Sequence, residues 1–428
     1  MSPREHYYSV GCKEGYRCHA GLLSIKDLLW YWLGGMLPKQ KNNWVFTSFR
    51  NKGYLDNAKY LFEYVVKHHP EIQATWITED EAVYHELKER GLNVKTPKEA
   101  RKTMLRAQLA ITDHYRLTDY KTENGFNART KLVQLWHGVG LKSMHPIGDV
   151  IPSTGQMGVR LSSDLFPMKG DGLLKRLYKK INYFFRAPAR ELYEKYYAFA
   201  CPGEETVKNK IQVWRVPESA VLYAGHPRNV MLHSSPVPSK PKLLYAPTFR
   251  WRGEAEEEMV ASMLRALPTI HARLDAVDGE LKIRLHPHTF RNYQERIEQA
   301  LQPYPRISLD KEKDIYTTLG QYSIIISDYS SIAYDFVLLD RPVIFLVPDK
   351  ESFVSSEVVF TYPFDEYSPG PQVQTWEGVM NEAMQYITNP AKDSAWRCRV
   401  RDEFYSMEHN DACNSARIVA VLKERLRL

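Results

Sequence analysis

The sequence is poor in cysteine and has no long apolar run, and each shortage excludes a class of protein. Its five cysteines are odd in number and scattered over 428 residues, so they indicate neither a disulfide framework nor an oxidising compartment. Cys12 and Cys18 lie six residues apart, but no second pair completes a zinc site, so we expect no metal centre. Helix-turn-helix, finger and ribonucleoprotein signatures are missing, so nucleic acid is not an expected partner.

The amino-terminal segment lacks the pattern of a secretory signal. Residues 22–38 are rich in Leu and Trp, but Lys26, Asp27 and two glycines interrupt them. A membrane span needs about 20 predominantly apolar residues, so this stretch is not a convincing transmembrane helix. We expect residues 1–40 to form an apolar segment that packs on the first domain or lies in a membrane interface.

Length and composition suit a globular protein with two cores, since 43% of the residues are hydrophobic and 25% are charged. In the first half, strands are predicted at 44–48, 74–78, 109–112 and just before 137, and helices at 56–68, 80–90 and 98–106. In the second half, strands are predicted at 242–245, 281–285, 324–326 and 343–347, and helices at 256–272 and 292–301. This alternation predicts an α/β fold of two doubly wound, Rossmann-like domains that face a cleft.

The predicted domain limits follow from composition. Residues 233–242 are rich in Ser and Pro and are interpreted as a linker. The first domain would comprise residues 41–232 with a basic insertion at 151–200. The second would comprise residues 243–428 and end in a carboxy-terminal helix.

One motif lies between two buried β-branched runs, at residues 322–348. Asp328, Ser330 and Ser331 stand where a polar turn passes into a helix, so their oxygens are expected to cap that helix. A helix start at the carboxyl ends of parallel strands suits a phosphate. The alternative is that these residues only cap the helix.

Other strand ends carry polar groups too. His137 follows a strand and precedes the glycine-rich turn 138–142. Thr248 and Arg250 follow the strand at 242–245, and His286 follows the strand at 281–285. An arginine fork and a histidine donor suit phosphoryl oxygens, so together these groups predict a nucleotide-diphosphate pocket. A core position for His137 is the alternative.

A basic stretch contributes to the net charge of +7. Between residues 169 and 190, seven cations stand against one acid, interleaved with apolar residues at roughly helical spacing. Its central cations are Lys175, Arg176, Lys179 and Lys180. Such a patch suits an anionic membrane face or a polyanionic acceptor, and a solvated helix face is the alternative.

Taken in order, several segments resemble one family, the CDP-glycerol glycerophosphotransferases, which include teichoic-acid primases and polymerases and capsule-synthesis relatives. The segments that carry the resemblance are residues 56–61, 134–142, 225–229, 245–250, 284–287, 328–341 and 410–417. The resemblance implies a glycosyltransferase-B-like architecture and transfer of glycerol phosphate from CDP-glycerol to a lipid-linked or saccharide acceptor, with release of CMP. It also implies a cytoplasmic location at the inner face of the cell membrane.

The resemblance implies roles residue by residue. His137 matches the histidine expected to act as general base, and His286 matches a second histidine beside the transferring phosphate. Ser330 and Ser331 would stabilise charge on the diphosphate. The remaining expected donor-binding residues are Arg228, Thr248, Arg250 and Asp328, and the expected acceptor-side residues are Gly138 and Lys142. No cofactor is required, and Mg²⁺ stays open as an addition.

The sequence departs from the family pattern at two places. Val139 and Gly140 stand where members often have Thr-Pro, and Ala412 stands where Gly is usual. The polyol therefore stays open, with CDP-ribitol as the alternative donor. A nucleotide-sugar glycosyltransferase of the same fold and a non-catalytic membrane- or polyanion-binding protein are the rival interpretations.

Overall fold

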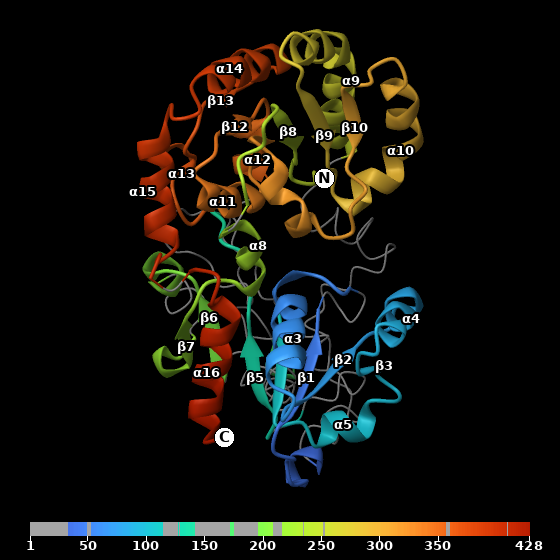
Figure 1. The fold of residues 1–428 in the computed structure, drawn as a ribbon, viewed down its shortest axis with the longest axis vertical. Coiled ribbons are helices and arrows are strands. Elements are labelled where there is room, and N and C mark those ends of the chain that lie inside the picture. The colour runs from blue at the N-terminus through green and yellow to red at the C-terminus, as the bar shows by residue number, and fades with distance from the viewer. Residues whose placement is uncertain are drawn as a thin grey trace. The chain divides into compact units, whose positions relative to one another are not determined.

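The computed structural model describes residues 33–48, 53–113, 127, 129–141, 172–174, 196–208, 216–233, 235–250, 253–356, 360–408 and 410–428. The chain divides into two compact units. The first unit takes its described residues from 33–137, 172–174, 196–228 and 413–428, and the second takes them from 138–141 and 229–412. Each unit is built on its own parallel sheet (Figure 1).

Within the described part of the first unit, seven parallel strands follow the order β3-β2-β1-β4-β5-β6-β7. Their bounds are β1 Asn43–Thr47, β2 Gln73–Ile77, β3 Val94–Lys95, β4 Leu109–Thr112, β5 Lys131–Gln134, β6 Ala198–Cys201 and β7 Val221–Tyr223. The order reverses between β1 and β4, where Val45 pairs with Ala110. A reversal of this kind is where open α/β sheets bind ligands, beyond the carboxyl ends of the strands.

Both faces of the first sheet are buried, and alternate residues of each strand point to opposite faces. Trp44 and Phe46 lie in one apolar cluster, and Val45 lies in another. The described helices and turns of this unit include α3 Asp56–His68, α4 Glu81–Glu89, α5 Arg101–Leu105, η4 Glu218–Ala220 and α16 Asn414–Leu426, with η5 Pro227–Asn229 at its end. α3 and α16 pack against each other and share the cluster that contains Trp44.

In the second unit, the described strands follow the order β10-β9-β8-β11-β12-β13, again all parallel. Their bounds are β8 Lys242–Tyr245, β9 Glu280–Ile283, β10 Ile307–Leu309, β11 Ile324–Ser327, β12 Val343–Leu346 and β13 Gln372–Val373. The order reverses between β8 and β11, so the reversal site of this sheet lies between the loops that follow these two strands.

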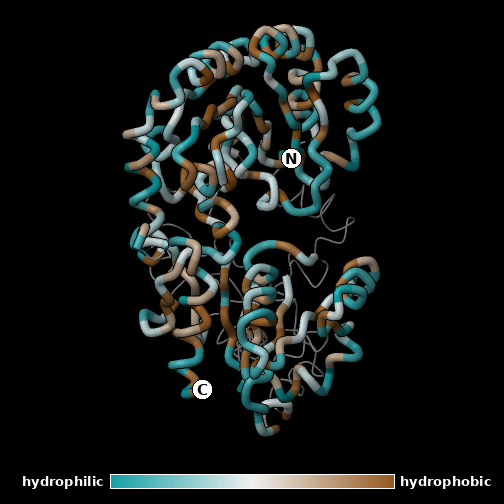
Figure 2. Tube along the Cα trace, viewed as in Figure 1, coloured by the Kyte–Doolittle hydropathy of each residue, from teal (hydrophilic) through white to brown (hydrophobic). Residues whose placement is uncertain are grey.

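Helices cover both faces of the second sheet. They are α8 Val230–His233, α9 Gly253–Asp275, α10 Pro287–Leu301, α11 Ile332–Phe336, α12 Lys350–Ser356, α13 Phe364–Tyr367, α14 Trp376–Thr388 and α15 Ser394–Phe404, with the turns η6 Ile315–Thr317, η7 Leu319–Gln321 and η8 Val337–Leu339. α9 and α14 contribute to the cluster that contains Ile326 and Ile344. Phe364 of α13 packs edge-on against Phe345, on the other face. Figure 2 shows α10 as mostly hydrophilic, in keeping with the few residues that this helix buries.

The predicted fold class is confirmed, because both units are doubly wound parallel sheets of the α/β class. The helix predicted at 56–68 and the strands predicted at 109–112 and 242–245 have the bounds found in the structure. Other predicted bounds shift by a few residues, most at the helix over 292–301, which begins at Pro287. That earlier start puts His286 at the N-cap.

Two predicted limits differ from the structure. The carboxy-terminal helix α16 belongs to the first unit, because Ile418, Val419 and Leu422 are buried in that unit's core. The chain passes between the units at Arg228–Asn229 rather than at 233–242. The carbonyls of Ser235 and Pro236 accept hydrogen bonds from Arg341, both at 2.9 Å, so these residues are tied to the second unit.

The predicted amino-terminal segment and the insertion at 151–200 lie almost entirely outside the described residues. Among the helices that the structure describes, none is both long enough and apolar enough to cross a membrane.

Candidate active site

Three residues predicted to bind the donor lie together at the carboxyl edge of the second sheet. The Thr248 N–H, after β8, donates to Asp328 Oδ1, after β11, at 2.8 Å. Arg250 Nη1 donates to Asp328 Oδ2 at 2.7 Å and to the Thr248 carbonyl at 2.8 Å. The Arg250 and Asp328 side chains are only 3% and 2% exposed. The loops after two neighbouring strands are therefore joined through a buried ion pair.

Asp349 completes this network, although the sequence did not single it out. Arg250 Nε donates to Asp349 Oδ2 at 2.7 Å, Nη2 donates to Oδ1 at 3.2 Å, and the Tyr329 hydroxyl donates to Oδ1 at 3.1 Å. The guanidinium also lies over the rings of Tyr329 and Phe353, which stack at 4.0 Å. Its position after a strand could have indicated Asp349 from the sequence, because Asp349 follows β12 as Asp328 follows β11.

The sequence predicts that Arg250 forms a planar fork on a phosphate, but the structure shows its guanidinium bonded to the protein. All three nitrogens of the Arg250 guanidinium donate to groups of the protein. Burial lowers the pKa of Arg250, but Asp328 and Asp349 outweigh burial and raise it overall. Burial also raises the pKa of Tyr329, and the two carboxylates add to that effect. Arg250 is thus a fixed cation that orders the loops.

The predicted caps on the helix after β11 also differ. Ser331 is the N-cap residue of α11, but its side chain makes no cap hydrogen bond. Asp328 Oδ1 accepts from the Tyr329 N–H at 2.6 Å and from the Thr248 N–H, so it closes the turn and joins a neighbouring loop. Ser330 and Ser331 are partly exposed, which leaves their side chains at the surface of this edge.

The segment that follows His137 lies against the same edge. A side chain at Gly140 would place its Cβ 3.3 Å from Ser331 Cβ, so the backbone passes close to Ser331. The Leu141 carbonyl accepts from the Thr361 N–H at 2.7 Å. Gly138 has φ +132°, a conformation that favours glycine. Lys142 lies outside the described residues.

His286 is exposed at the start of α10, which follows β9. Its Nδ1 accepts from the His288 N–H at 3.2 Å. Its ring lies 5.1 Å from the ring of Phe249, which belongs to the loop after β8. His286 therefore neighbours the loop that carries Thr248 and Arg250.

His137 stands after β5, at the carboxyl edge of the first sheet. The residue before it, Trp136, has φ +58° and is held by Asn57, whose Nδ2 donates to the Trp136 carbonyl at 2.6 Å. The Trp136 ring packs 4.2 Å from the His137 imidazole. The first turn of α3 thus fixes the peptide that leads into His137.

Arg228 differs from the other predicted donor-binding residues because it belongs to the first unit. Its Nη1 donates to Asp56 Oδ1 at 2.6 Å, and both side chains are buried. Its N–H donates to Asn57 Oδ1 at 3.2 Å. Within the first unit, Arg228 therefore ties the loop after β7 to the start of α3.

Comparison with known families decides how these residues are interpreted. Residues 30–149 and 194–424 match the model of the CDP-glycerol:poly(glycerophosphate) glycerophosphotransferase family. The chain belongs to this family. The match contains His137, His286 and the predicted donor-binding residues, and it leaves out residues 150–193, where the predicted basic patch lies.

Curated relatives of this chain are distant in sequence. The teichoic acid poly(glycerol phosphate) polymerase of Bacillus subtilis is 24% identical over 84% of this chain, and that of Bacillus spizizenii is 24% identical over 88%. A teichoic acid ribitol-phosphate primase of Bacillus spizizenii is 31% identical over 31% of this chain. The chain spans 46% of the first relative, 91% of the second and 32% of the third.

Among solved structures, the wall teichoic acid polymerase TagF resembles this chain with a TM-score of 0.66 at 18% identity. The similarity covers 99% of this chain and 96% of the TagF chain. A structure of MnaA with UDP from S. aureus gives a TM-score of 0.51 at 12% identity, over 90% of this chain and 97% of that one. These likenesses establish the glycosyltransferase-B-like fold.

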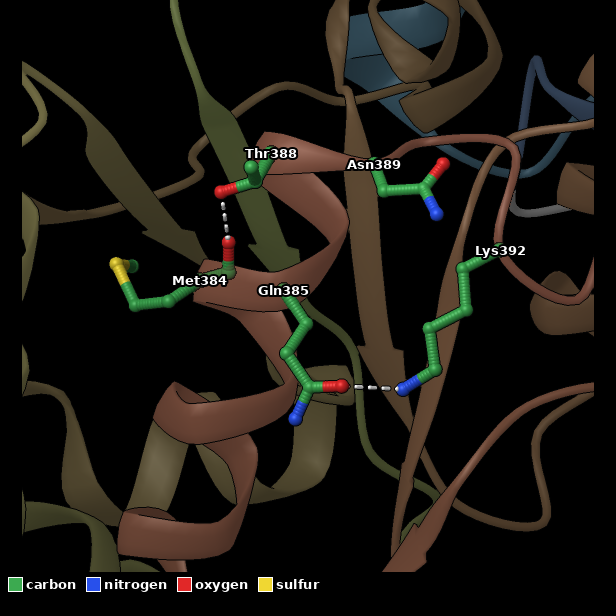
Figure 3. Close-up of a pocket in the computed structure, with 5 residues that line it drawn as sticks. All are labelled: Met384, Gln385, Thr388, Asn389 and Lys392. Atoms are coloured by element: carbon green, nitrogen blue, oxygen red, sulfur yellow. Dashed lines mark hydrogen bonds between the residues drawn. The ribbon is translucent and has the colours of Figure 1, made fainter.

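A surface depression of the second unit lies outside the candidate site. A depression at the end of α14 is lined by Met384, Gln385, Thr388, Asn389 and Lys392, with Lys392 Nζ donating to Gln385 Oε1 at 2.7 Å (Figure 3). Since α14 follows the parallel strand β13, this end lies toward the amino ends of the strands, away from the loops described above. In the part of the chain that the structure describes, no three His, Cys, Asp or Glu side chains are arranged to hold a metal ion.

The predicted basic patch of Lys175, Arg176, Lys179 and Lys180 lies outside the described residues.

Proposed function

We propose that this chain transfers glycerol phosphate from CDP-glycerol to a hydroxyl group of a lipid-linked or saccharide acceptor, as in teichoic-acid synthesis, and releases CMP. The family match over residues 30–149 and 194–424 carries the proposal. It runs through both sheets and includes the strand ends on which the candidate residues stand.

In the proposed reaction, the acceptor hydroxyl attacks the β-phosphorus of CDP-glycerol. A new P–O bond forms, and the bond between the β-phosphorus and the bridging oxygen breaks. The electron pair of that bond leaves with CMP. We assign to His137 the role of general base that takes the hydroxyl proton. The fixed peptide before His137, held by Asn57, supports that role because a base must be correctly placed to be efficient.

The loops at the carboxyl edge of the second sheet are assigned to the donor. Thr248, Ser330, Ser331 and His286 are all partly or fully exposed there, and we assign their hydroxyl and imidazole groups to the phosphoryl oxygens of the donor. Arg250 and Asp328 are assigned a supporting role because they are buried and bonded to each other. Arg228, paired with Asp56, is assigned to the architecture of the first unit.

The test is acceptor-dependent CMP release from CDP-glycerol by the full chain, with His137→Ala as the decisive variant. We expect a loss of at least about 100-fold in rate, as for removal of a general base. His85→Ala is a matched control, because His85 is an exposed histidine of the same unit on α4. Full activity in a folded His137→Ala protein would overturn the assignment.

CDP-ribitol should be tested in parallel, since one relative is a ribitol-phosphate primase. UDP- and GDP-sugars test the rival glycosyltransferase, which would release a nucleoside diphosphate instead of CMP. Docking on an anionic membrane face, a need for Mg²⁺ and an acceptor-side role for Gly138 and Lys142 remain predictions of the sequence.

A further inference from the structure

His286 is held at one nitrogen by the start of its own helix. The backbone N–H of His288 donates to His286 Nδ1 at 3.2 Å. A backbone N–H can only donate, so Nδ1 must present its lone pair. In a neutral imidazole, the proton then resides on Nε2. Protonation of Nδ1 would break this contact, so the fold favours the neutral ring with an Nε2–H donor.

The first turn of α10 that supplies this contact is itself anchored. Pro287 restricts the backbone at the first helical position. Thr289 is buried, and its hydroxyl donates to Glu256 Oε1 of α9 at 2.5 Å. His288 Nδ1 lies 3.5 Å from the same carboxylate, so the His288 side chain turns toward α9. The His288 N–H is therefore a fixed donor to His286 Nδ1.

Phe249 holds the ring of His286 from a second direction. The two ring centroids lie 5.1 Å apart at an interplanar angle of 34°. Phe249 also meets the His288 ring edge-on at 4.8 Å. Its neighbours in the chain are Thr248 and Arg250, which are both bonded to the buried Asp328. The ion-pair network thus sets the place of the Phe249 ring, and that ring packs against His286.

We propose that Phe249 is a positioning residue that, together with the first turn of α10, holds His286 as a neutral Nε2–H donor for a phosphoryl oxygen of the donor substrate. The inference deepens the proposed function and rests on it for the identity of the substrate. The two histidines then have different chemical roles: His286 donates a hydrogen bond, and His137 takes the proton from the acceptor.

The experiment combines ¹⁵N NMR of histidine-labelled full-length protein with steady-state CMP release. The tautomer is visible without substrate, because a protonated and an unprotonated ring nitrogen resonate in different regions. The His286→Asn variant assigns the signals, since it should remove one pair. We expect the wild-type His286 Nδ1 to be unprotonated and its Nε2 to be protonated.

The decisive variant is Phe249→Leu, which keeps apolar bulk but removes the ring. We expect the His286 signals to move toward the average of the two tautomers, and kcat to fall about tenfold while the KM for CDP-glycerol changes little. Phe249→Tyr keeps the ring and should retain both the wild-type tautomer and kcat. Tyr304→Leu is the matched control, because Tyr304 packs on His271 in the same unit, at 5.6 Å.

A protonated Nδ1 in the wild-type protein would overturn the inference. So would a Phe249→Leu protein whose His286 signals stay unchanged, even if its rate falls. Failure of the proposed function gives a different pattern: no CMP release from any donor, while the NMR signals of His286 and of the Phe249 variants still behave as stated.

Discussion

At the residue scale, the side chain of Arg250 joins the loops that follow β8, β11 and β12 in the second unit. Its three nitrogens make four hydrogen bonds, to Asp328, Asp349 and the Thr248 carbonyl, and its plane lies over two aromatic rings. A planar guanidinium can join three loops at once, which a lysine could not do. The cation therefore fixes the loops that the proposed function assigns to the donor.

Asp349→Asn tests this role. The change removes one carboxylate from the buried Arg250 while keeping its size, so we expect the second unit to lose about 1–3 kcal/mol of stability. We also expect the KM for CDP-glycerol to rise, because the loops that carry Thr248 and Ser330 would be less ordered. Urea unfolding and CMP release measure the two effects.

The matched control is Asp365→Asn. Asp365 pairs with Lys350 in the same unit, but its side chain is 72% exposed. Exposed ion pairs contribute little, so stability should change by less than about 1 kcal/mol. Equal effects of the two substitutions would contradict a special role for Asp349.

At the scale of elements, the start of α3 depends on a side chain from another strand. Its N-cap residue, Leu55, has no side chain that can accept a hydrogen bond. Asp113, at the end of β4, accepts from the Ala58 N–H at 2.9 Å and from the Ser48 hydroxyl at 2.8 Å. The cap of this helix is thus supplied by tertiary structure, and the same turn carries Asn57.

Asp113→Ala should loosen α3 and the peptide before His137. We expect a loss of about 2 kcal/mol, since a buried cap is removed and the Ser48 hydroxyl loses its acceptor. Amide exchange in α3 is the measurement, read together with kcat for CMP release. Asp80→Ala is the comparison, because Asp80 caps α4 through the Val83 N–H at a less buried site and should cost about 1 kcal/mol or less. Unchanged exchange in α3 after Asp113→Ala would contradict the capping role.

At the scale of the whole molecule, the chain returns to the first unit after building the second. α16 packs on α3 and buries Ile418, Val419 and Leu422 in the first core. The last helix is therefore part of the core that supports the first sheet. In the chain, it follows the 184 residues 229–412 of the second unit.

Ile418→Ala tests this assignment. Ile418 is fully buried, so its truncation should cost about 2–5 kcal/mol. We expect faster amide exchange in β1 and α3, and unchanged exchange in β11 and β12. Ile270→Ala is the reciprocal variant, because Ile270 is fully buried in the core of the second unit and should give the opposite pattern. Loosening of the second unit by Ile418→Ala would contradict the division.

The periodic parts of this protein could be predicted from its sequence. Short β-branched runs such as 324–326 have no polar face, which predicts strands that are buried on both sides. The helices predicted between these strands indicate that the strands run parallel. Strand ends then indicate where Thr248, His286, Asp328 and His137 stand, because the residues after parallel strands share one edge of a sheet.

Only the tertiary structure decided the partners of these residues. Nothing in the local sequence pairs Arg250 with Asp349, 99 positions away, or Asp113 with the start of α3. The sequence places α16 in the wrong unit, since its apolar stripe would suit either core. Periodicity is a local property of the chain, whereas ion pairs, caps and helix docking depend on which distant segments the folded sheets bring together.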